Sequence, residues 1–259
     1  MPMSTNKKIT ILIPCYNESA GVGSVIDGFK AVADRTPDYD FEIIAVDNNS
    51  KDSTSEVAKR HGAAVHFEGK KGKGNAMRSA FAQISADTDF VVMLDGDDTY
   101  RASEVMRLIE PLEAGFCTVV LGSRLKGKMQ NNAMSAFNRF GNHFFTALAR
   151  VFYGVQATDV LTGYYAWKAD AVRKMTPHLT SEGFTIEIEM VAKMAKLGES
   201  IFSVPINYDA RAGESNLKPV EDGIKILKVL IGNLFWNPVK KTPVSAVPDE
   251  LDDVLVQGI

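Results

Sequence analysis

The order of apolar and polar residues predicts four strands that alternate with helices in the first hundred residues. Short β-branched or apolar runs, each followed by polar turn residues, predict strands at residues 9–14, 41–47, 64–67 and 91–94. Helical patterns cover 22–33 and 55–61, and a third helix opens after the Lys70–Gly74 loop and runs to about residue 85. This alternation is typical of an α/β fold with a Rossmann-like, mostly parallel sheet flanked by helices and a binding crevice along the carboxyl edge of the strands.

The fourth predicted strand ends in a cluster of carboxylates. Residues 91–94 are all apolar, as in an interior strand that is covered on both faces. Asp95 and Asp97 follow at once, and two carboxylates that converge there would repel each other unless a cation lay between them. A hard divalent ion, Mg²⁺ or Mn²⁺, meets that need. The alternative is an acidic turn that caps the next helix.

The other predicted strands also end in polar groups, and these suit a nucleoside diphosphate. The polar residues are Tyr16, Asn17 and Glu18 after the first strand, Asp47, Asn48 and Asn49 after the second, and Lys70–Gly74 after the third. We expect the base and ribose near Asp47 and the phosphates near Lys73 and the ion, where Gly72 and Gly74 let backbone amides approach closely. The alternative for this loop is a solvated turn, and it matches neither a Walker loop nor a dinucleotide fingerprint.

Composition narrows the class of protein. The chain has 259 residues, of which 45% are hydrophobic and 24% charged, and its net charge of −3 gives no basic footprint for nucleic acid. Cys15 and Cys117 lie in apolar surroundings, so we expect buried free thiols, as in a reducing compartment. The sequence shows no signal-peptide core, and no run approaches the ~20 apolar residues of a spanning helix. These features indicate a protein of the cytoplasm or of the cytoplasmic face of a membrane.

The last part of the chain predicts two apolar helices and a tail. A stripe on a helix over 138–152 is expected to pack in the core, with the members Phe140, Phe144, Phe145, Leu148 and Phe152. A second helix over 221–236 is expected to pack on the domain, or to lie among lipid headgroups near Lys240 and Lys241. Glu187 and Glu189 alternate with isoleucines, which predicts a solvated face. We divide the chain into one domain, 1–236, with halves at 1–120 and 121–236, and a linker with an acidic tail over 237–259.

Four motifs in the first half together resemble family 2 glycosyltransferases with the GT-A fold. They are Ile13–Glu18, Val46–Thr54, Gly72–Ala76 and Asp95–Asp97, in this order and with strand-consistent spacing. Motifs of the second half are similar to those of polyprenyl-phosphate glycosyltransferases such as dolichyl-phosphate mannose synthase: Gly122–Arg124, Arg139, Asp159–Tyr164, Gly183–Phe184 with Glu189, and Arg211–Leu217. The resemblance runs from about residue 9 to residue 235.

The resemblance implies a set of site residues. Asp95 and Asp97 would hold the metal ion, with Thr99 as a third polar ligand. The nucleotide-sugar site would comprise Pro14, Tyr16, Asn17, Glu18, Asp47, Asn49, Lys73, Gly74 and Asp95. The phosphate of the acceptor would meet Arg124, Arg139, Arg211 and Ser215. Two departures from the family pattern leave the base preference and the last loop open, because Asn48-Asn49 replaces the commoner Asp-Gly and Asn216 replaces a lysine.

The chemistry of the acceptor separates the remaining alternatives. A phosphate acceptor is already an anion and needs cationic clamps, for which arginine is suited. A hydroxyl acceptor needs a base, for which Asp159 is the candidate, although Asp159 can equally orient an arginine or cap a turn. We therefore predict a metal-dependent, inverting transfer of a hexose from GDP-mannose, UDP-glucose or UDP-N-acetylglucosamine to a polyprenyl phosphate, with Asp97, Asp159, Arg124 and Arg139 as candidate catalytic residues. The alternatives are transfer to a hydroxyl of a glycan or small soluble acceptor, and a catalytically silent nucleotide-sugar-binding subunit. The oligomeric state stays open.

Overall fold

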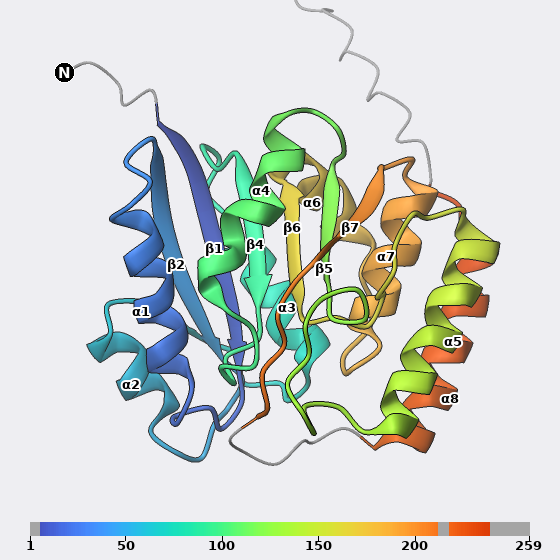
Figure 1. Cartoon of the computed structure of the whole chain (residues 1–259), viewed down its shortest axis with the longest axis horizontal. Coiled ribbons are helices and arrows are strands. Elements are labelled where there is room, and N and C mark those ends of the chain that lie inside the picture. Colours follow the sequence, from blue (N-terminus) through green and yellow to red (C-terminus); the bar gives the residue numbers. More distant parts are fainter. Residues whose placement is uncertain (1–5, 212–217, 239–259) are drawn as a thin grey trace, which may run out of the picture.

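The computed structural model describes residues 6–211 and 218–238, which form one α/β body around a seven-stranded sheet (Figure 1). The strands are β1 (Lys7–Cys15), β2 (Tyr39–Asp47), β3 (Ala64–Phe67), β4 (Phe90–Leu94), β5 (Val119–Ser123), β6 (Tyr164–Lys168) and β7 (Ile201–Pro205). Their order in the sheet is β3-β2-β1-β4-β6-β5-β7. β6 runs antiparallel to β4 and β5, and the other neighbouring pairs are parallel, so the predicted mostly parallel sheet is confirmed.

Helices cover both faces of the sheet, and each face has its own apolar core. They are α1 (Val22–Ala33), α2 (Thr54–Arg60), α3 (Lys73–Phe81), α4 (Val105–Glu113), α5 (Ala136–Tyr153), α6 (Ala169–Met175), α7 (Ile186–Lys196) and α8 (Pro219–Leu234), with short 3₁₀ turns at Ala102–Glu104 and Thr176–His178. Helices α1, α2 and α4 pack on one face, and α3, α5, α6, α7 and α8 contribute to the other core. Alternation along β4 explains the two cores, because Val91 and Met93 point to one face and Val92 and Leu94 to the other.

Helix α7 is surrounded by protein, which overturns one prediction. It contacts α3, α5, α6, α8 and β7, and its residues 186–194 are all buried. Glu187 and Glu189 are 6% and 1% exposed, so the expected solvated face is wrong. The alternating charges look solvent-facing in the sequence, but both carboxylates have partners that compensate their burial. Glu187 pairs with Lys73, which is distant along the chain, and Glu189 accepts hydrogen bonds from Thr180 and Ser181 in the preceding loop.

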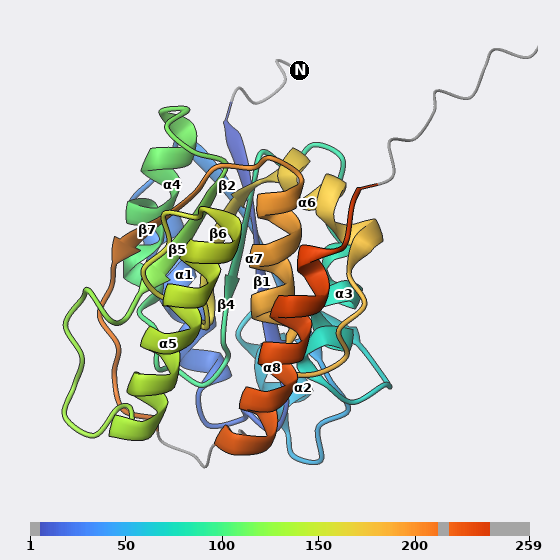
Figure 2. The same ribbon diagram turned by 90° about the vertical axis from the view of Figure 1, so that its right-hand side faces the viewer.

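Helices α5 and α8 form the outermost layer on this side and pack side by side against α7 (Figure 2). Phe145 is buried and Leu148 partly buried, as expected for the core. The prediction is wrong for Phe140, Phe144 and Phe152, which are exposed because no element covers the far side of α5 among the described residues. In the second helix, Ile226 and Leu230 pack inward as predicted, while Ile224 and Ile231 are exposed.

Two further expectations concern cysteines and membranes. Cys15 and Cys117 are both free and buried, as predicted. Within residues 6–211 and 218–238, none of the helices is both long enough and apolar enough to cross a bilayer. Of the predicted tail over 237–259, residues 239–259 lie outside the described part of the chain. Ser215 also lies outside it.

Candidate active site

Two adjoining cavities lie where β1, β2 and β4 end. The first has a volume of about 300 Å³ and the second about 420 Å³. Five residues line both cavities and therefore form their common boundary: Lys73, Asp95, Asp97, Phe184 and Arg211. Ligand sites in open α/β sheets occupy this carboxyl edge.

The chain that leaves β1 forms one wall of the first cavity. Asn17 has a positive φ of 57°, which turns the chain after the strand, and its Oδ1 accepts a hydrogen bond from Lys51 N at 2.7 Å. The backbone N–H of Glu18 donates to Thr54 Oγ1 at 2.9 Å. These bonds tie the segment to the turn after β2, while Pro14, Tyr16 and Glu18 line the cavity.

The turn after β2 shapes the lysine–glycine loop. Asp47 is buried, and its two oxygens accept hydrogen bonds from Ser50 N and Ser55 Oγ. Asn48 lines the first cavity and makes three hydrogen bonds to the backbone of residues 68–72. Its Nδ2 donates to the carbonyls of Glu68 (3.2 Å) and Lys70 (2.7 Å), and its Oδ1 accepts from Gly72 N at 2.6 Å. Asn48 therefore fixes the loop, whereas Asp47 stabilises the turn.

Lys73 begins α3 and reaches the centre of the site. Its Nζ lies 2.7 Å from Asp95 Oδ1 and 2.6 Å from Glu187 Oε1. Burial alone would lower the pKa of Lys73, but Asp95 and Glu187 raise it well above its usual value, so this amine stays charged. Gly74 is required next to it, because a Cβ there would lie 2.1 Å from the Ser181 carbonyl oxygen.

Asp97 and Glu18 share the second cation of the site. Arg211 Nη1 lies 3.2 Å from Asp97 Oδ2, and Arg211 Nη2 also contacts Glu18 Oε1. The other oxygen of Asp97 accepts from Thr99 Oγ1 at 2.6 Å, so Thr99 orients this carboxylate. The pKa of Glu18 is raised to about 7, chiefly by burial and also by Asp97 and Asp95, although the contact with Arg211 opposes this shift.

The carboxylates of Asp95 and Asp97 suit a hard divalent cation whose coordination shell would be completed by oxygen atoms of the substrate. Among the residues described, no group of three or more His, Cys, Asp or Glu side chains is arranged to hold an ion alone. Mg²⁺ typically takes one or two carboxylates and fills its shell with water and phosphate oxygens, which Asp95 and Asp97 can support. In the chain by itself, Lys73 and Arg211 neutralise these two carboxylates.

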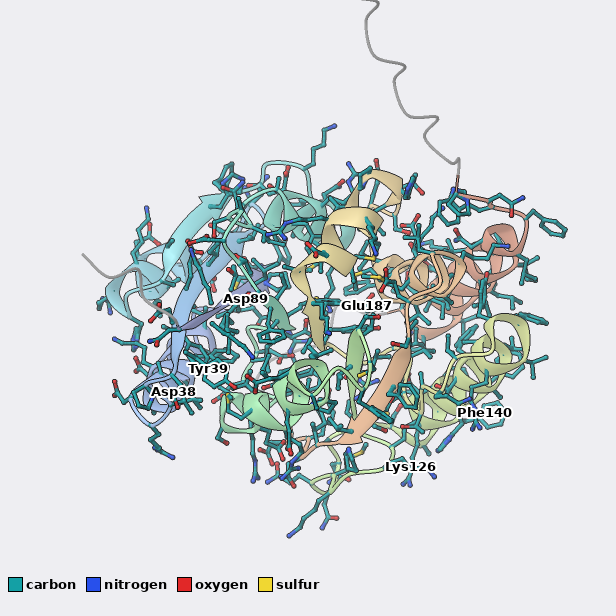
Figure 3. The ribbon with its side chains drawn as sticks, turned by 90° about the horizontal axis from the view of Figure 1, so that it is seen from above. Asp38, Tyr39, Asp89, Lys126, Phe140 and Glu187 are labelled. Atoms are coloured by element: carbon teal, nitrogen blue, oxygen red, sulfur yellow. The ribbon has the colours of Figure 1, made fainter. Side chains whose placement is uncertain are left out.

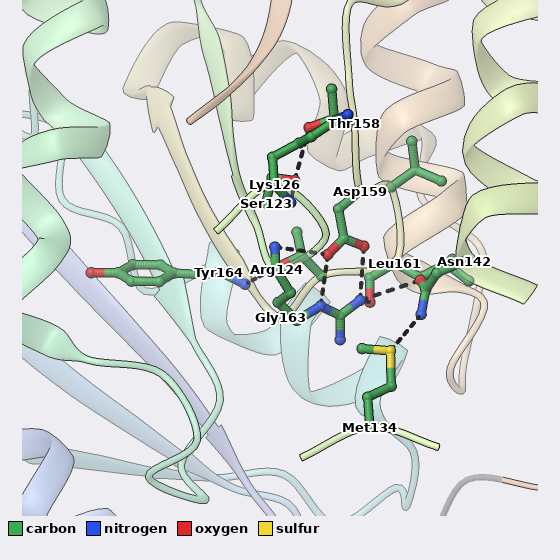
Figure 4. Close-up of polar contacts among 12 residues, drawn as sticks. Ser123, Arg124, Lys126, Met134, Asn142, Thr158, Asp159, Leu161, Gly163 and Tyr164 are labelled. Carbon is green, nitrogen blue, oxygen red and sulfur yellow. Dashed lines mark hydrogen bonds and ion pairs between the residues drawn. The ribbon is translucent and has the colours of Figure 1, made fainter. Parts of the chain in front are cut away.

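The second cavity extends from these carboxylates to the N-terminal halves of α5 and α8, where Phe137, Phe145 and Ile226 line it. Its polar side contains Arg124, whose Nε and Nη2 lie 2.7 and 2.8 Å from the two oxygens of Asp159 (Figure 4). Nη2 also donates to the Leu161 carbonyl at 2.7 Å. Asp159 is fully buried in this pair. The remaining nitrogen, Nη1, has no hydrogen-bond partner in the described part of the chain.

The structure brings together some of the predicted site residues and separates others. Those that line a cavity are Pro14, Tyr16, Glu18, Lys73, Asp95, Asp97, Arg124 and Arg211. Those that line neither cavity but hold the neighbouring segments in place are Asn17, Asp47, Asn49, Gly74, Thr99 and Asp159. Arg139 is exposed in the first turn of α5 and lines neither cavity.

Asn48, Lys71 and Glu187 have roles in the site that were not assigned from the sequence. Asn48 holds the loop, Lys71 donates from Nζ to the Tyr16 hydroxyl at 2.8 Å, and Glu187 binds Lys73. The first two lie inside motifs that the sequence already singled out, so their proximity to the nucleotide residues was a usable signal. No local signal marks Glu187, because its partner Lys73 is far away in the sequence.

Comparisons with known proteins identify a matching family model, related sequences and a solved structure with a similar fold. The family model described as "Glycosyl transferase family 2" matches residues 10–175. Glycosyltransferase AglJ of Haloferax volcanii is 35% identical over 85% of this chain and 70% of its own length. A dolichyl-phosphate hexose transferase of the same organism is 32% identical over 86% of this chain and 92% of its own length. Glucosyl-3-phosphoglycerate synthase of Mycobacterium tuberculosis, solved with Mn²⁺, UDP-glucose and phosphoglyceric acid, superposes with a TM-score of 0.67 at 23% identity, over 90% of this chain and 81% of that one.

Proposed function

Because the chain belongs to glycosyl transferase family 2, with the GT-A fold, we propose that it transfers a hexose from a nucleoside-diphosphate sugar to a polyprenyl phosphate, with inversion. The single observation that carries the proposal is the pair of cavities that meet at Lys73, Asp95, Asp97 and Arg211. The first suits the nucleotide, and the second leads away from it toward apolar side chains. The polyprenyl-phosphate relative supports the acceptor class, and the donor is GDP-mannose, UDP-glucose or UDP-N-acetylglucosamine.

In this proposal Asp95 and Asp97 hold Mg²⁺ or Mn²⁺, and Thr99 orients Asp97. When bound, the ion neutralises charge on the leaving diphosphate. Lys73 adds a fixed positive charge beside it, and its buried ion pairs keep the amine in place. Tyr16 and Lys71 lie at the edge of the first cavity, where a flat nucleobase can stack on the Tyr16 ring.

The acceptor phosphate is assigned to the second cavity. Arg124 offers Nη1 there, while Asp159 and the Leu161 carbonyl hold the rest of its guanidinium. Arg211 stands at the boundary between donor and acceptor. Asp159 is assigned the orienting role, because a fully buried carboxylate whose oxygens both bind Arg124 is poorly placed to accept a proton from a hydroxyl. This favours the phosphate acceptor over the hydroxyl acceptor.

The outer surface of α5 and α8 is assigned to the membrane that carries the lipid acceptor. Eight of the eleven large hydrophobic side chains that are exposed in the described residues lie on these two helices. Arg139, Arg150, Lys225 and Lys228 are exposed among them, and α5 contains no acidic residue. Apolar tips between basic groups suit the boundary of anionic headgroups and acyl chains. The second cavity reaches the N-terminal halves of the same helices.

The test is transfer of labelled sugar from the three donors to a short polyprenyl phosphate, with Mn²⁺ or with EDTA. We expect one donor to give a lipid-extractable product in the presence of the ion only. Asp97→Asn should lower the rate on the order of a hundredfold or more. The matched control is Asp98→Asn, an exposed neighbour that lines neither cavity and should keep full activity. Transfer to soluble hydroxyl acceptors alone would overturn the acceptor, and donor binding without any turnover would favour the silent subunit.

A further inference from the structure

Phe184 is the apolar member of the boundary between the two cavities. The other residues that line both cavities carry charges and form ion pairs with one another: Lys73 with Asp95, and Arg211 with Asp97. The proposed steps use these charged groups and leave Phe184 without a role. A phenyl ring has no hydrogen-bonding group, so its effect on the site must come from its volume and its lack of polar atoms.

Phe184 belongs to the loop before α7, and hydrogen bonds hold this loop in place. Glu189 in α7 accepts four hydrogen bonds of 2.7–3.1 Å from the backbone and hydroxyl of Thr180 and from the backbone of Ser181. Thr185 Oγ1 donates to Ser181 Oγ at 2.9 Å, which closes the loop on itself. The loop therefore presents the ring of Phe184 from a fixed backbone.

The same loop packs on the lysine–glycine loop at the start of α3. A Cβ at Gly74 would lie 2.1 Å from the carbonyl oxygen of Ser181, and a Cβ at Gly72 would lie 2.2 Å from that of Glu182. Seen from above, Glu187, which follows the loop in α7, lies among the inner elements of the molecule (Figure 3). The ring is thus held at a set place beside the expected position of the donor phosphates.

The boundary between the cavities is where a nucleophile reaches the donor sugar, because the diphosphate is assigned to the first cavity and the acceptor phosphate to the second. In transfer, an oxygen of the acceptor phosphate bonds to the anomeric carbon, and the bond from that carbon to the diphosphate breaks. In hydrolysis, a water oxygen forms the new bond, the same bond to the diphosphate breaks, and a proton goes to the solvent. Closing a site against water suppresses this side reaction.

We propose that Phe184 excludes water from the anomeric carbon and thereby directs the sugar to the acceptor phosphate instead of to hydrolysis. This inference rests on the proposed function, since it presumes a nucleotide-sugar donor and a phosphate acceptor. Without the ring, the space would be bordered by the four charged residues of the boundary. A cavity with polar walls takes up water, whereas an apolar cavity stays dry.

The rate of donor hydrolysis without any acceptor tests the inference. Release of UDP or GDP is followed at saturating nucleotide sugar with Mn²⁺ present, using the donor that supports transfer. Phe184→Ala should raise this rate at least about tenfold, while the KM for the donor stays within about threefold of wild type. An unchanged or lower hydrolysis rate would overturn the inference, and a raised KM beside it would assign the ring to donor binding alone.

A conservative variant separates the volume of the ring from damage to the loop. Phe184→Leu keeps an apolar side chain of similar size and should hold hydrolysis within about threefold of wild type. Hydrolysis as fast as in Phe184→Ala would overturn exclusion by apolar volume. Phe137→Ala is the matched control, because Phe137 lines the second cavity but not the first, and its hydrolysis rate should stay within about twofold of wild type. Equal acceleration in Phe137→Ala and Phe184→Ala would overturn the assignment to the boundary.

A second measurement needs no variant. In the wild type, transfer to a saturating polyprenyl phosphate should be at least about a hundredfold faster than hydrolysis of the same donor. Comparable rates would overturn the inference, because water would then reach the sugar as readily as the acceptor does. If no donor is turned over either with or without an acceptor, the proposed function itself fails, which is a distinct result.

Discussion

At the scale of single residues, Glu18 is held in surroundings that oppose its charge. Burial, Asp97 and Asp95 outweigh the contact with Arg211, and the pKa is raised from 4.5 to about 7. Between these two values the native chain keeps a proton that the unfolded chain releases. The free energy of unfolding should therefore fall as the pH rises from about 4.5 through 7, by the linkage relation.

Glu18→Gln removes this titration, so its free energy of unfolding should depend less steeply on pH between 5 and 7.5 than that of the wild type. Urea denaturation at several pH values in EDTA measures the two profiles. Parallel profiles for variant and wild type would contradict the assignment of the titration to Glu18.

The residues of the site show what local sequence can and cannot predict. Asp95, Asp97, Lys73 and Glu18 were predicted because polar groups after apolar strands converge at one edge of a parallel sheet. The supporting role of Asp47 was not predicted. It depends on the folded turn, in which the two oxygens of Asp47 accept hydrogen bonds from Ser50 and Ser55. The role of Glu187 could not be predicted, because the pattern around it indicates a solvent-exposed side chain. Its partner, Lys73, belongs to α3, which is distant along the chain.

At the scale of elements, the first four strands and their helices follow from periodicity, whereas the antiparallel β6 does not. Its insertion between β4 and β5 brings the turn before it against the end of β4. Gly163, in that turn, lies so close to Asp95 that a Cβ would be 2.1 Å from Asp95 Oδ2. Its backbone N–H also donates to the Tyr100 hydroxyl at 2.6 Å, which fixes the turn.

Gly163→Ala should therefore displace the Asp95 carboxylate and weaken Mn²⁺-dependent donor binding by at least about tenfold, at a cost in stability of about 1–3 kcal/mol from overpacking. Calorimetric titration of the donor and thermal unfolding measure the two effects. Gly232→Ala is the matched control, because nothing lies within 4 Å of a Cβ at this helical position. It should raise stability by about 0.5–1 kcal/mol and leave binding unchanged. Unaltered donor affinity in Gly163→Ala would show that Asp95 tolerates the displacement.

At the scale of the whole molecule, the exposed apolar side chains gather on the side that the second cavity reaches. Phe140 on α5 is 71% exposed and Ile224 on α8 is 54% exposed, and the two helices pack against each other. The pattern of the sequence predicts a helix correctly in both cases. Which of its apolar positions stay uncovered depends on how many layers lie outside it, and this is a property of the whole assembly of elements.

The membrane assignment predicts that this surface, and not exposed aromatic residues in general, binds lipid. Phe140→Asp should lower the affinity for phosphatidylglycerol-containing vesicles by roughly tenfold or more, because it exchanges an inserted apolar ring for a charge that anionic headgroups repel. Co-sedimentation at several vesicle concentrations measures the effect. Phe67→Asp is the matched control, since Phe67 is 61% exposed but lies on β3, the far edge strand of the sheet. Binding should weaken at high salt, because the basic residues contribute electrostatically. An equal loss for both variants, or no vesicle binding by the wild type, would remove the membrane role from α5 and α8 while leaving the donor site intact.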